Sequence, residues 1–167
     1  MDRKRTESRS LNPVQKAMTQ YSETELENYM RAALVEGRKA LPECAPNPPV
    51  GCVLVRDGEI IARGYTNPPG QFHAEAMALA QVEGFLEDVT AFVTLEPCSF
   101  YGRTPSCAKT LVRRKIGEVF VALIDPHPKN RGCGIQIIKD ADIPVQIGLL
   151  GEEAKKDLRP HLCKKEE

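Results

Sequence analysis

The amino-acid sequence predicts an α/β fold in which helices pack on a mixed five-stranded sheet. Five short segments are apolar or rich in β-branched and aromatic residues, and the later ones alternate with stretches of helix-forming composition. Strands that alternate with helices are typical of a sheet covered by helices. The chain has 167 residues, of which 41% are hydrophobic, and this suffices for one domain with an ordinary core.

The N-terminal part of the chain divides into a tail and a first helix. Residues 1–20 are polar, mixed in charge and without periodicity, so we expect a flexible tail there and a single domain over residues 21–167. Residues 22–25, with the sequence Ser-Glu-Thr-Glu, form a capping box, and apolar residues then recur at helical spacing. This helix is expected to stop before Pro42, because residues 42–49 hold four prolines and predict a rigid loop.

A hairpin and a series of alternating strands and helices follow. The nearly continuous apolar run at 50–55 predicts a buried strand, and Asp57-Gly58 predicts a tight turn into a partner strand at 60–62. Composition predicts further strands at 90–95, 118–124 and 145–148, and helices at 74–82, 107–115, 135–140 and 152–162.

Charge and composition argue against several classes of protein. The chain has 23 basic and 23 acidic residues, whereas proteins that bind nucleic acid usually carry a basic excess. No apolar run reaches the length of about 18 residues that a membrane span needs, and the charged N-terminus does not form a secretory signal. We therefore expect a cytoplasmic protein, with a nuclear location left open by the basic triplet at residues 3–5. We expect neither a nucleic-acid partner nor a membrane.

Two short motifs carry the chemistry. His73-Ala74-Glu75 stands at the start of a predicted helix, while Cys98 follows a predicted strand and Cys107 opens another helix. One imidazole and two thiolates suit zinc, and three protein ligands leave the fourth tetrahedral position to water, as in catalytic zinc sites. The sequence therefore predicts one zinc ion per chain, bound by His73, Cys98 and Cys107.

Glu75 lies two residues from a predicted ligand, within reach of a water on the metal. Zinc lowers the pKa of bound water towards about 7, so we expect zinc-bound hydroxide to attack a ring carbon that bears an amino group. Glu75 would take the proton of the water, protonate a ring nitrogen and, in a second transfer, protonate the departing amine, a role that typically contributes about 10²–10⁴-fold in rate. The zinc-deaminase signature pairs H-x-E with P-C-x-x-C, but here eight residues separate the cysteines.

Five blocks of the sequence together resemble a known family. They are Asn-Pro-Pro-Val-Gly at 47–51, His-Ala-Glu at 73–75, Thr-Leu-Glu-Pro-Cys-Ser at 94–99, Tyr-Gly-Arg-Thr-Pro at 101–105 followed by Cys107, and Asp-Pro at 125–126. With these blocks, about three quarters of the chain resembles the pyrimidine deaminase family of riboflavin biosynthesis, within the cytidine deaminase-like superfamily. The eight-residue gap between the cysteines is a trait of that family. The resemblance implies a three-layer α-β-α fold with helices on both faces of the sheet.

The resemblance also implies a substrate and its contacts. Members of the family remove an amino group from a diaminopyrimidinone that carries a sugar phosphate. Carried over by position, Asn47 would contact the sugar or the ring, and Arg103 and Thr104 would approach the phosphate. A guanidinium offers phosphate paired donors. Asp125 and His127 would line the sugar end.

Three departures from the bacterial pattern concern the sugar. Bacterial members typically have His where this chain has Met77 and Phe100, and they have Asp-Pro-Asn-Pro where it has Asp-Pro-His-Pro at 125–128. Fungal-type stand-alone deaminases are similar to the present chain at the first two places, and their substrate carries an open-chain ribityl group. The resemblance therefore favours a ribitylamino substrate over a ribosylamino one.

Two other functions fit parts of the pattern. A deaminase of cytidine, another nucleobase or tRNA adenosine would share the fold, but such enzymes generally keep the short cysteine spacing. A non-enzymatic zinc module would use the same ligands, but it has no need of Glu75 beside the metal. Because the superfamily usually forms oligomers, we expect a homodimer that acts on a small pyrimidine phosphate.

Overall fold

The computed structural model describes residues 20–102 and 104–162. Its centre is a five-stranded sheet in the order β2-β1-β3-β4-β5. β1 pairs antiparallel with β2 and β3, whereas β3, β4 and β5 run parallel, so the sheet is mixed as predicted. The strands are β1 (Gly51–Arg56), β2 (Glu59–Tyr65), β3 (Val89–Val93), β4 (Glu118–Val121) and β5 (Val145–Ile147).

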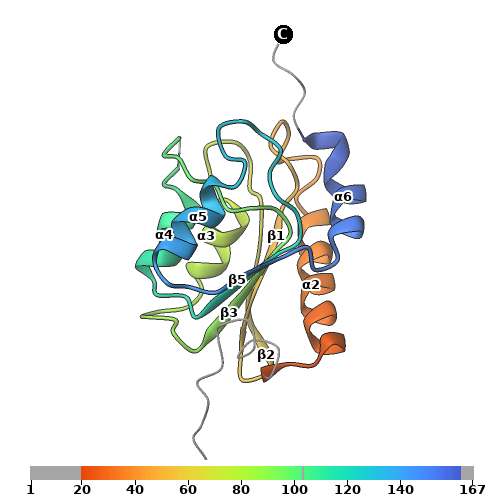
Figure 1. Ribbon diagram of the computed structural model, residues 1–167. Coiled ribbons are helices and arrows are strands. Elements are labelled where there is room, and N and C mark those ends of the chain that lie inside the picture. The colour runs from red at the N-terminus through yellow and green to blue at the C-terminus, as the bar shows by residue number, and fades with distance from the viewer. Residues whose placement is uncertain (1–19, 103, 163–167) are drawn as a thin grey trace, which may run out of the picture.

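Helices cover both faces of this sheet, which confirms the predicted three-layer α-β-α fold (Figure 1). Within the described residues, no helix is both long enough and apolar enough to cross a membrane. The predicted tail lies almost wholly outside those residues, so the division into a tail and one domain stays a prediction. One face carries α2 (Glu23–Arg38) and α6 (Gly151–Leu158), which η1 (Arg159–His161) continues, and the other carries α3 (Ala74–Leu79), α4 (Cys107–Arg113) and α5 (Cys133–Asp140).

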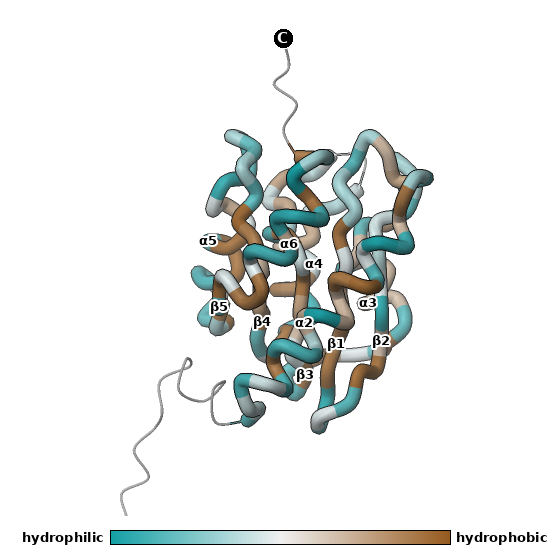
Figure 2. The backbone as a smooth tube through the Cα atoms, turned by 90° about the vertical axis from the view of Figure 1, so that its right-hand side faces the viewer, coloured by the Kyte–Doolittle hydropathy of each residue, from teal (hydrophilic) through white to brown (hydrophobic). Residues whose placement is uncertain are grey.

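Alternation along the inner strands produces the two buried layers. On β1, Cys52 and Leu54 face the layer of α3, α4 and α5, whereas Val53 faces the layer of α2 and α6. Phe92 of β3 is fully buried in the second layer and stacks on Phe120 of β4, with ring centroids 4.9 Å apart. Figure 2 shows the result as hydrophobic strands behind helices whose outer residues are hydrophilic. Strands buried on both faces give continuous apolar runs, which is why composition identifies them.

Several predicted segments are longer than the elements that form, and two of them border the site. The helix predicted at 74–82 ends at Leu79, because the Arg114 guanidinium donates to backbone carbonyls within residues 79–84 and pairs them outside the helix. The strand predicted at 118–124 ends at Val121. Beyond it the backbone turns away from the sheet, and the amide of Asp125 donates to a side chain instead of a strand.

The carboxyl ends of β3 and β4 meet at one edge of the sheet, because these two strands are parallel neighbours. The loops of residues 94–106 and 122–132 leave from this edge and lead into α4 and α5. Ligands of open α/β sheets bind in the crevice outside the carboxyl ends of the strands. The topology therefore places both predicted cysteine ligands and the Asp-Pro-His-Pro segment at the favoured edge.

α2 is fixed at its start and packs very closely on β1. The Ser22 hydroxyl accepts the amide of Glu25, and the Glu25 carboxylate accepts the amide of Ser22, as the predicted capping box requires. Further along, a Cβ atom placed on Gly51 would lie 1.7 Å from the carbonyl oxygen of Ala33 and 2.6 Å from the amide nitrogen of Gly37. Only glycine fits at this crossing.

Replacing Gly51 with alanine is expected to lower the free energy of unfolding by about 1–3 kcal/mol or more, because the helix must move away from the strand. Gly102→Ala is the matched control, since the nearest atom to its Cβ would be 3.9 Å away. That control should stay within about 0.5 kcal/mol of the unmodified protein. Chemical denaturation measures both changes, and equal stability of the two variants would contradict the close packing.

Candidate metal centre

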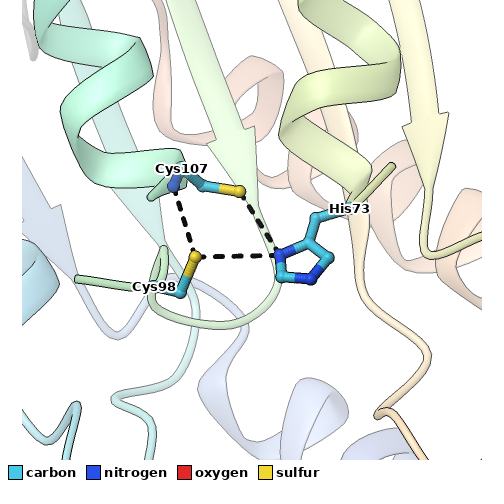
Figure 3. A group of neighbouring side chains, drawn as sticks. All are labelled: His73, Cys98 and Cys107. Carbon is cyan, nitrogen blue, oxygen red and sulfur yellow. Dashed lines mark hydrogen bonds between the residues drawn. The ribbon is translucent and has the colours of Figure 1, made fainter. Parts of the chain in front are cut away.

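Three side chains from separate parts of the chain meet at the edge described above (Figure 3). His73 is the N-cap residue of α3, Cys98 lies in the loop after β3, and Cys107 is the first residue of α4. The Nδ1 atom of His73 lies 3.7 Å from the Cys98 sulfur and 3.4 Å from the Cys107 sulfur. The structure thus brings together the three side chains that the sequence predicts as zinc ligands.

The spacing of these atoms fits a tetrahedral zinc ion. Zinc lies about 2.0 Å from nitrogen and about 2.3 Å from sulfur, so its ligand atoms are separated by roughly 3.6 Å. The three donor atoms of the cluster all lie within 4.8 Å of one another. The second ring nitrogen of His73, Nε2, lies 3.5 Å from the Thr104 hydroxyl. A histidine that binds zinc through one nitrogen typically holds the other in such a hydrogen bond.

Hydrogen bonds within the cluster favour a thiolate. The side chain of Cys107 donates to Cys98, its backbone amide donates to the same sulfur over 3.2 Å, and together with His73 these contacts lower the pKa of Cys98 to about 4. The hydrogen bond with Cys98 in turn raises the pKa of Cys107, and the bond to Cys98 raises the pKa of His73. Binding of zinc would release the remaining thiol proton, because cysteine binds the metal as the thiolate.

The eight-residue gap between the cysteines is closed by backbone contacts at its ends. The carbonyl of Cys98 accepts the Ser106 hydroxyl at 2.8 Å and the Ala108 amide at 3.1 Å. Ser106 also caps α4, because its hydroxyl accepts the amide of Lys109. These contacts bring the two ends of the gap together, and both sulfurs face His73.

Glu75 lies in the first turn of α3, close to the metal ligands. Its side chain is buried, and it lines a pocket of about 250 Å³ together with His73 and Cys98. Burial raises the pKa of the Glu75 carboxyl above its ordinary value, and the negative Cys98 adds to this rise. The carboxyl also takes part in a hydrogen bond with Cys107. The position suits a group that holds and releases a proton beside the metal.

The predicted substrate residues are distributed over two adjoining cavities. Asn47, Asp125 and His127 line the 250 Å³ pocket. Asn47 and Thr104 line a neighbouring cavity of about 390 Å³, which also reaches His73 and Cys98. Arg103 lies outside the described residues, so the structure does not place its side chain.

The two residues that mark the fungal-type pattern have different surroundings. Phe100 lines both cavities, and 47% of its surface is exposed. Met77 points to the loop after β2, where its sulfur accepts the backbone amide of Tyr65 and the side-chain amide of Asn67. Of these two residues, Phe100 is therefore the one placed to contact the sugar of a bound substrate.

Several residues around the site could not be assigned from the sequence. Thr66, Leu95 and Leu162 line the same pocket as Glu75, although they come from distant parts of the chain. Glu96 and Asn130 are buried. Both form hydrogen bonds with Asp125 of the loop after β4, and Asn130 lies in that loop itself.

Comparison with known proteins agrees with this geometry. The profile of the cytidine and deoxycytidylate deaminase zinc-binding region matches residues 23–123. The chain is 44% identical over 128 residues to the riboflavin biosynthesis protein RibD of Haemophilus influenzae, an alignment that covers 77% of this chain and 34% of that protein. It is 40% identical over 147 residues to the chloroplastic riboflavin biosynthesis protein PYRD of Arabidopsis thaliana, covering 87% of this chain and 34% of that protein. The chain thus spans about a third of the length of these curated relatives.

Solved structures show the same architecture. One form of RibD from Acinetobacter baumannii superposes with a TM-score of 0.80 at 41% identity, covering 85% of this chain and 40% of that one. The Aspergillus oryzae Rib2 deaminase has a TM-score of 0.61 at 22% identity and covers 83% of this chain and 100% of that one. At that identity the likeness shows the fold alone.

The family profile and the cluster coincide. His73, Cys98 and Cys107 all lie within the matched residues, and the profile is that of a zinc-binding region. The predicted zinc cofactor is therefore confirmed, with a donor set and spacing that suit the ion. On this match, which spans more than half of its residues, the chain belongs to the cytidine and deoxycytidylate deaminase family.

Proposed function

We propose that this chain is a zinc-dependent aminohydrolase of riboflavin biosynthesis, which deaminates a diaminopyrimidinone carrying a ribitylamino or ribosylamino 5′-phosphate. The observation that carries the proposal is the shared pocket of His73, Cys98 and Glu75. A structural zinc site usually has four protein ligands and needs no buried carboxyl beside it. The RibD and PYRD relatives, which are named as riboflavin biosynthesis proteins, support the choice of pathway.

The division of labour in the pocket follows from its chemistry. When bound, zinc supplies Lewis acidity that lowers the pKa of a coordinated water towards about 7. Glu75 would take one proton from a water at the metal and give it to a ring nitrogen. The second proton of that water, released from the new hydroxyl group as the ring carbonyl forms, would pass through Glu75 to the departing amine. Because burial raises the pKa of Glu75, this carboxyl holds the transferred proton more readily than an exposed one would. His73, Cys98 and Cys107 hold the metal.

The other predicted residues then bind the substrate. We assign Asn47 to the ring or the sugar, since it lines both cavities. Asp125 and His127, on the loop after β4, take the sugar end. Thr104 lines the second cavity and, with Arg103, takes the phosphate. The larger cavity leaves room for a phosphate beyond the ring.

Phe100 favours the open-chain ribityl form of the substrate. An aromatic ring at this place offers no hydrogen bond to a closed ribose, where bacterial members typically present His. Overall sequence identity favours the ribosylamino form instead. A Thermotoga maritima protein that is 36% identical to this chain is named as a phosphoribosylaminopyrimidine deaminase and uracil reductase. Phe100 is the stronger indication, because the two substrates differ only in the sugar and only residues near the sugar can distinguish them.

Nucleic acid is a less suitable partner. A tRNA:A34 deaminase shares the fold with a TM-score of 0.62 at 27% identity. The chain nevertheless balances 23 basic with 23 acidic residues, and eight residues instead of two separate its cysteines. The homodimer and the cytoplasmic location stay predictions, and the plant relatives are named as chloroplastic proteins.

Replacing His73 with alanine, or Cys98 or Cys107 with serine, is expected to reduce bound zinc from about one ion per chain to a small fraction. Each change removes one of three protein ligands, and binding depends on all of them. Cys133→Ser, at an exposed cysteine on α5, is the matched control and should keep its zinc. Elemental analysis of the purified variants measures this, and a Cys98→Ser protein with full zinc content would rule out the assigned ligand set.

Glu75→Gln is expected to keep zinc but to lower kcat by about 10²–10⁴-fold or more, because the proton shuttle is lost while the ligands remain. Glu36→Gln makes the same change at a buried glutamate of α2, outside the pocket, and should keep nearly full activity. Steady-state release of ammonia and elemental analysis provide the two readouts. A Glu75→Gln enzyme with full activity would refute the proposed mechanism.

The purified protein is expected to release ammonia from the two pyrimidine phosphates, with a higher kcat/KM for the ribitylamino form, and not from cytidine or tRNA. The Phe100→His variant should shift the ratio of the two kcat/KM values towards the ribosylamino form, because His restores a polar contact. Activity on cytidine or tRNA alone would refute the proposed substrate. Turnover of the ribosylamino form alone would leave the deaminase intact but refute the argument from Phe100.

A further inference from the structure

The loop after β4 forms one wall of the pocket, and a buried carboxylate holds it. Asp125 and His127 of this loop line the pocket. Glu96, only 4% exposed, accepts three backbone amides: those of Asp125 at 3.2 Å and Gly132 at 2.9 Å through Oε1, and that of Ile135 at 3.1 Å through Oε2. The two ends of the loop are therefore fixed to one side chain.

A buried amide completes the connection from inside the loop. Asn130 is 1% exposed, and its Oδ1 atom accepts the backbone amide of Ser99 at 3.0 Å. Its Nδ2 atom donates to the carbonyl of Pro97 at 3.3 Å and to the Asp125 carboxylate at 3.2 Å. Pro97 and Ser99 are the two neighbours of Cys98. One side chain thus joins the backbone on both sides of a metal ligand to a residue of the pocket wall.

The loop and the metal-ligand segment are also packed without space between them. A Cβ atom placed on Gly134, in the first turn of α5, would lie 1.8 Å from the carbonyl oxygen of Pro97. Buried polar groups that lose a partner are costly, so Glu96 and Asn130 keep one arrangement of their neighbours. The distance between Cys98 and the sugar end of the pocket is then set by these bonds.

We infer that Glu96 and Asn130 are positioning residues, which hold the loop of residues 125–132 at a fixed distance from Cys98 so that Asp125 and His127 meet the sugar of the bound substrate. The substrate part of this inference rests on the proposed function. Glu96 also lines the pocket, but its two oxygens accept the three backbone amides, and the amide group of Asn130 is bonded to the protein at both of its ends. Loosening the loop therefore weakens binding of the substrate much more than it slows the chemical step at the metal.

Three variants separate the individual hydrogen bonds. Asn130→Ala removes all three bonds of this side chain. Asn130→Asp keeps the acceptor for Ser99 but loses the donor to Pro97 and sets a second carboxylate beside Asp125. Glu96→Gln preserves the shape of the side chain, and its one oxygen can still accept the amides of Asp125 and Gly132. Its NH₂ group then faces the amide of Ile135 and cannot accept a hydrogen bond from it. The last two variants nearly preserve side-chain volume, and Glu36→Gln again serves as the control at a buried glutamate.

Amide hydrogen exchange, zinc content and steady-state kinetics are measured on each variant. We expect faster exchange at Ser99, Asp125 and Gly132 in Asn130→Ala, a protected Ser99 amide in Asn130→Asp, and faster exchange at Ile135 in Glu96→Gln. For the pyrimidine phosphate that the unmodified protein turns over, KM should rise by about tenfold in all three variants, as the loss of about one charged hydrogen bond predicts. Zinc should be retained, and kcat should change by less than about threefold.

Three results would overturn the inference. Unchanged exchange at these amides would show that the side chains do not hold the loop, and this holds even if the unmodified protein deaminates none of the substrates and the proposed function fails. Faster exchange with KM unchanged, or a fall in kcat that follows loss of zinc, would show a role in stability or metal binding alone. Faster exchange with a raised KM, retained zinc and nearly constant kcat supports positioning.

Discussion

The carbonyl group of Cys98 is the point on which the site depends. It accepts one hydrogen bond from the Ser106 hydroxyl and one from the amide of Ala108, so the end of the loop after β3 is fixed to the first turn of α4. These two bonds close a loop of eight residues and set both sulfurs against His73. A site with two intervening residues needs no such closure. Here the extra length is used to bring Thr104 beside the imidazole and to extend the cavity away from the metal.

The sheet supplies the rigid support for this arrangement. β1 and β3 are buried on both faces, and β4 continues the same layer, so the carboxyl ends of β3 and β4 cannot shift independently. His73 and Cys107 sit at the amino ends of α3 and α4, and Cys98 lies in the loop after β3, in the crevice that such sheets use for ligands. Burial then acts on the electrostatics. It raises the pKa of Glu75, while hydrogen bonds from Cys107 lower that of Cys98, so one carboxyl is prepared to carry a proton and one sulfur to lose it.

The sequence predicts the layers and the metal cluster well, because both depend on local signals. Apolar runs identify β1, β3 and β4, and a histidine with two cysteines at helix starts identifies the ligands. It does not predict Glu96 and Asn130, since polar residues in loops show no periodicity and their burial arises only when the chain folds. Met77 illustrates the same limit. Its place in the family pattern suggested the pocket, but a sulfur contact with Asn67 turns it to a neighbouring loop.

The predicted metal ligands and the predicted sugar contacts thus lie on different segments, and these segments meet at residues 96–98. Cys98 is a predicted metal ligand. Glu96, two residues earlier, accepts backbone amides at both ends of the loop that carries Asp125 and His127. A relative can therefore change the loop after β4 without altering the metal ligands, provided that the loop still satisfies the buried carboxylate. This chain departs from the bacterial pattern in that loop, at His127, and at Phe100, which lines the same pocket. Both residues line the pocket and neither is a predicted metal ligand, so a change at these two places can alter the contacts to the substrate without altering the metal site.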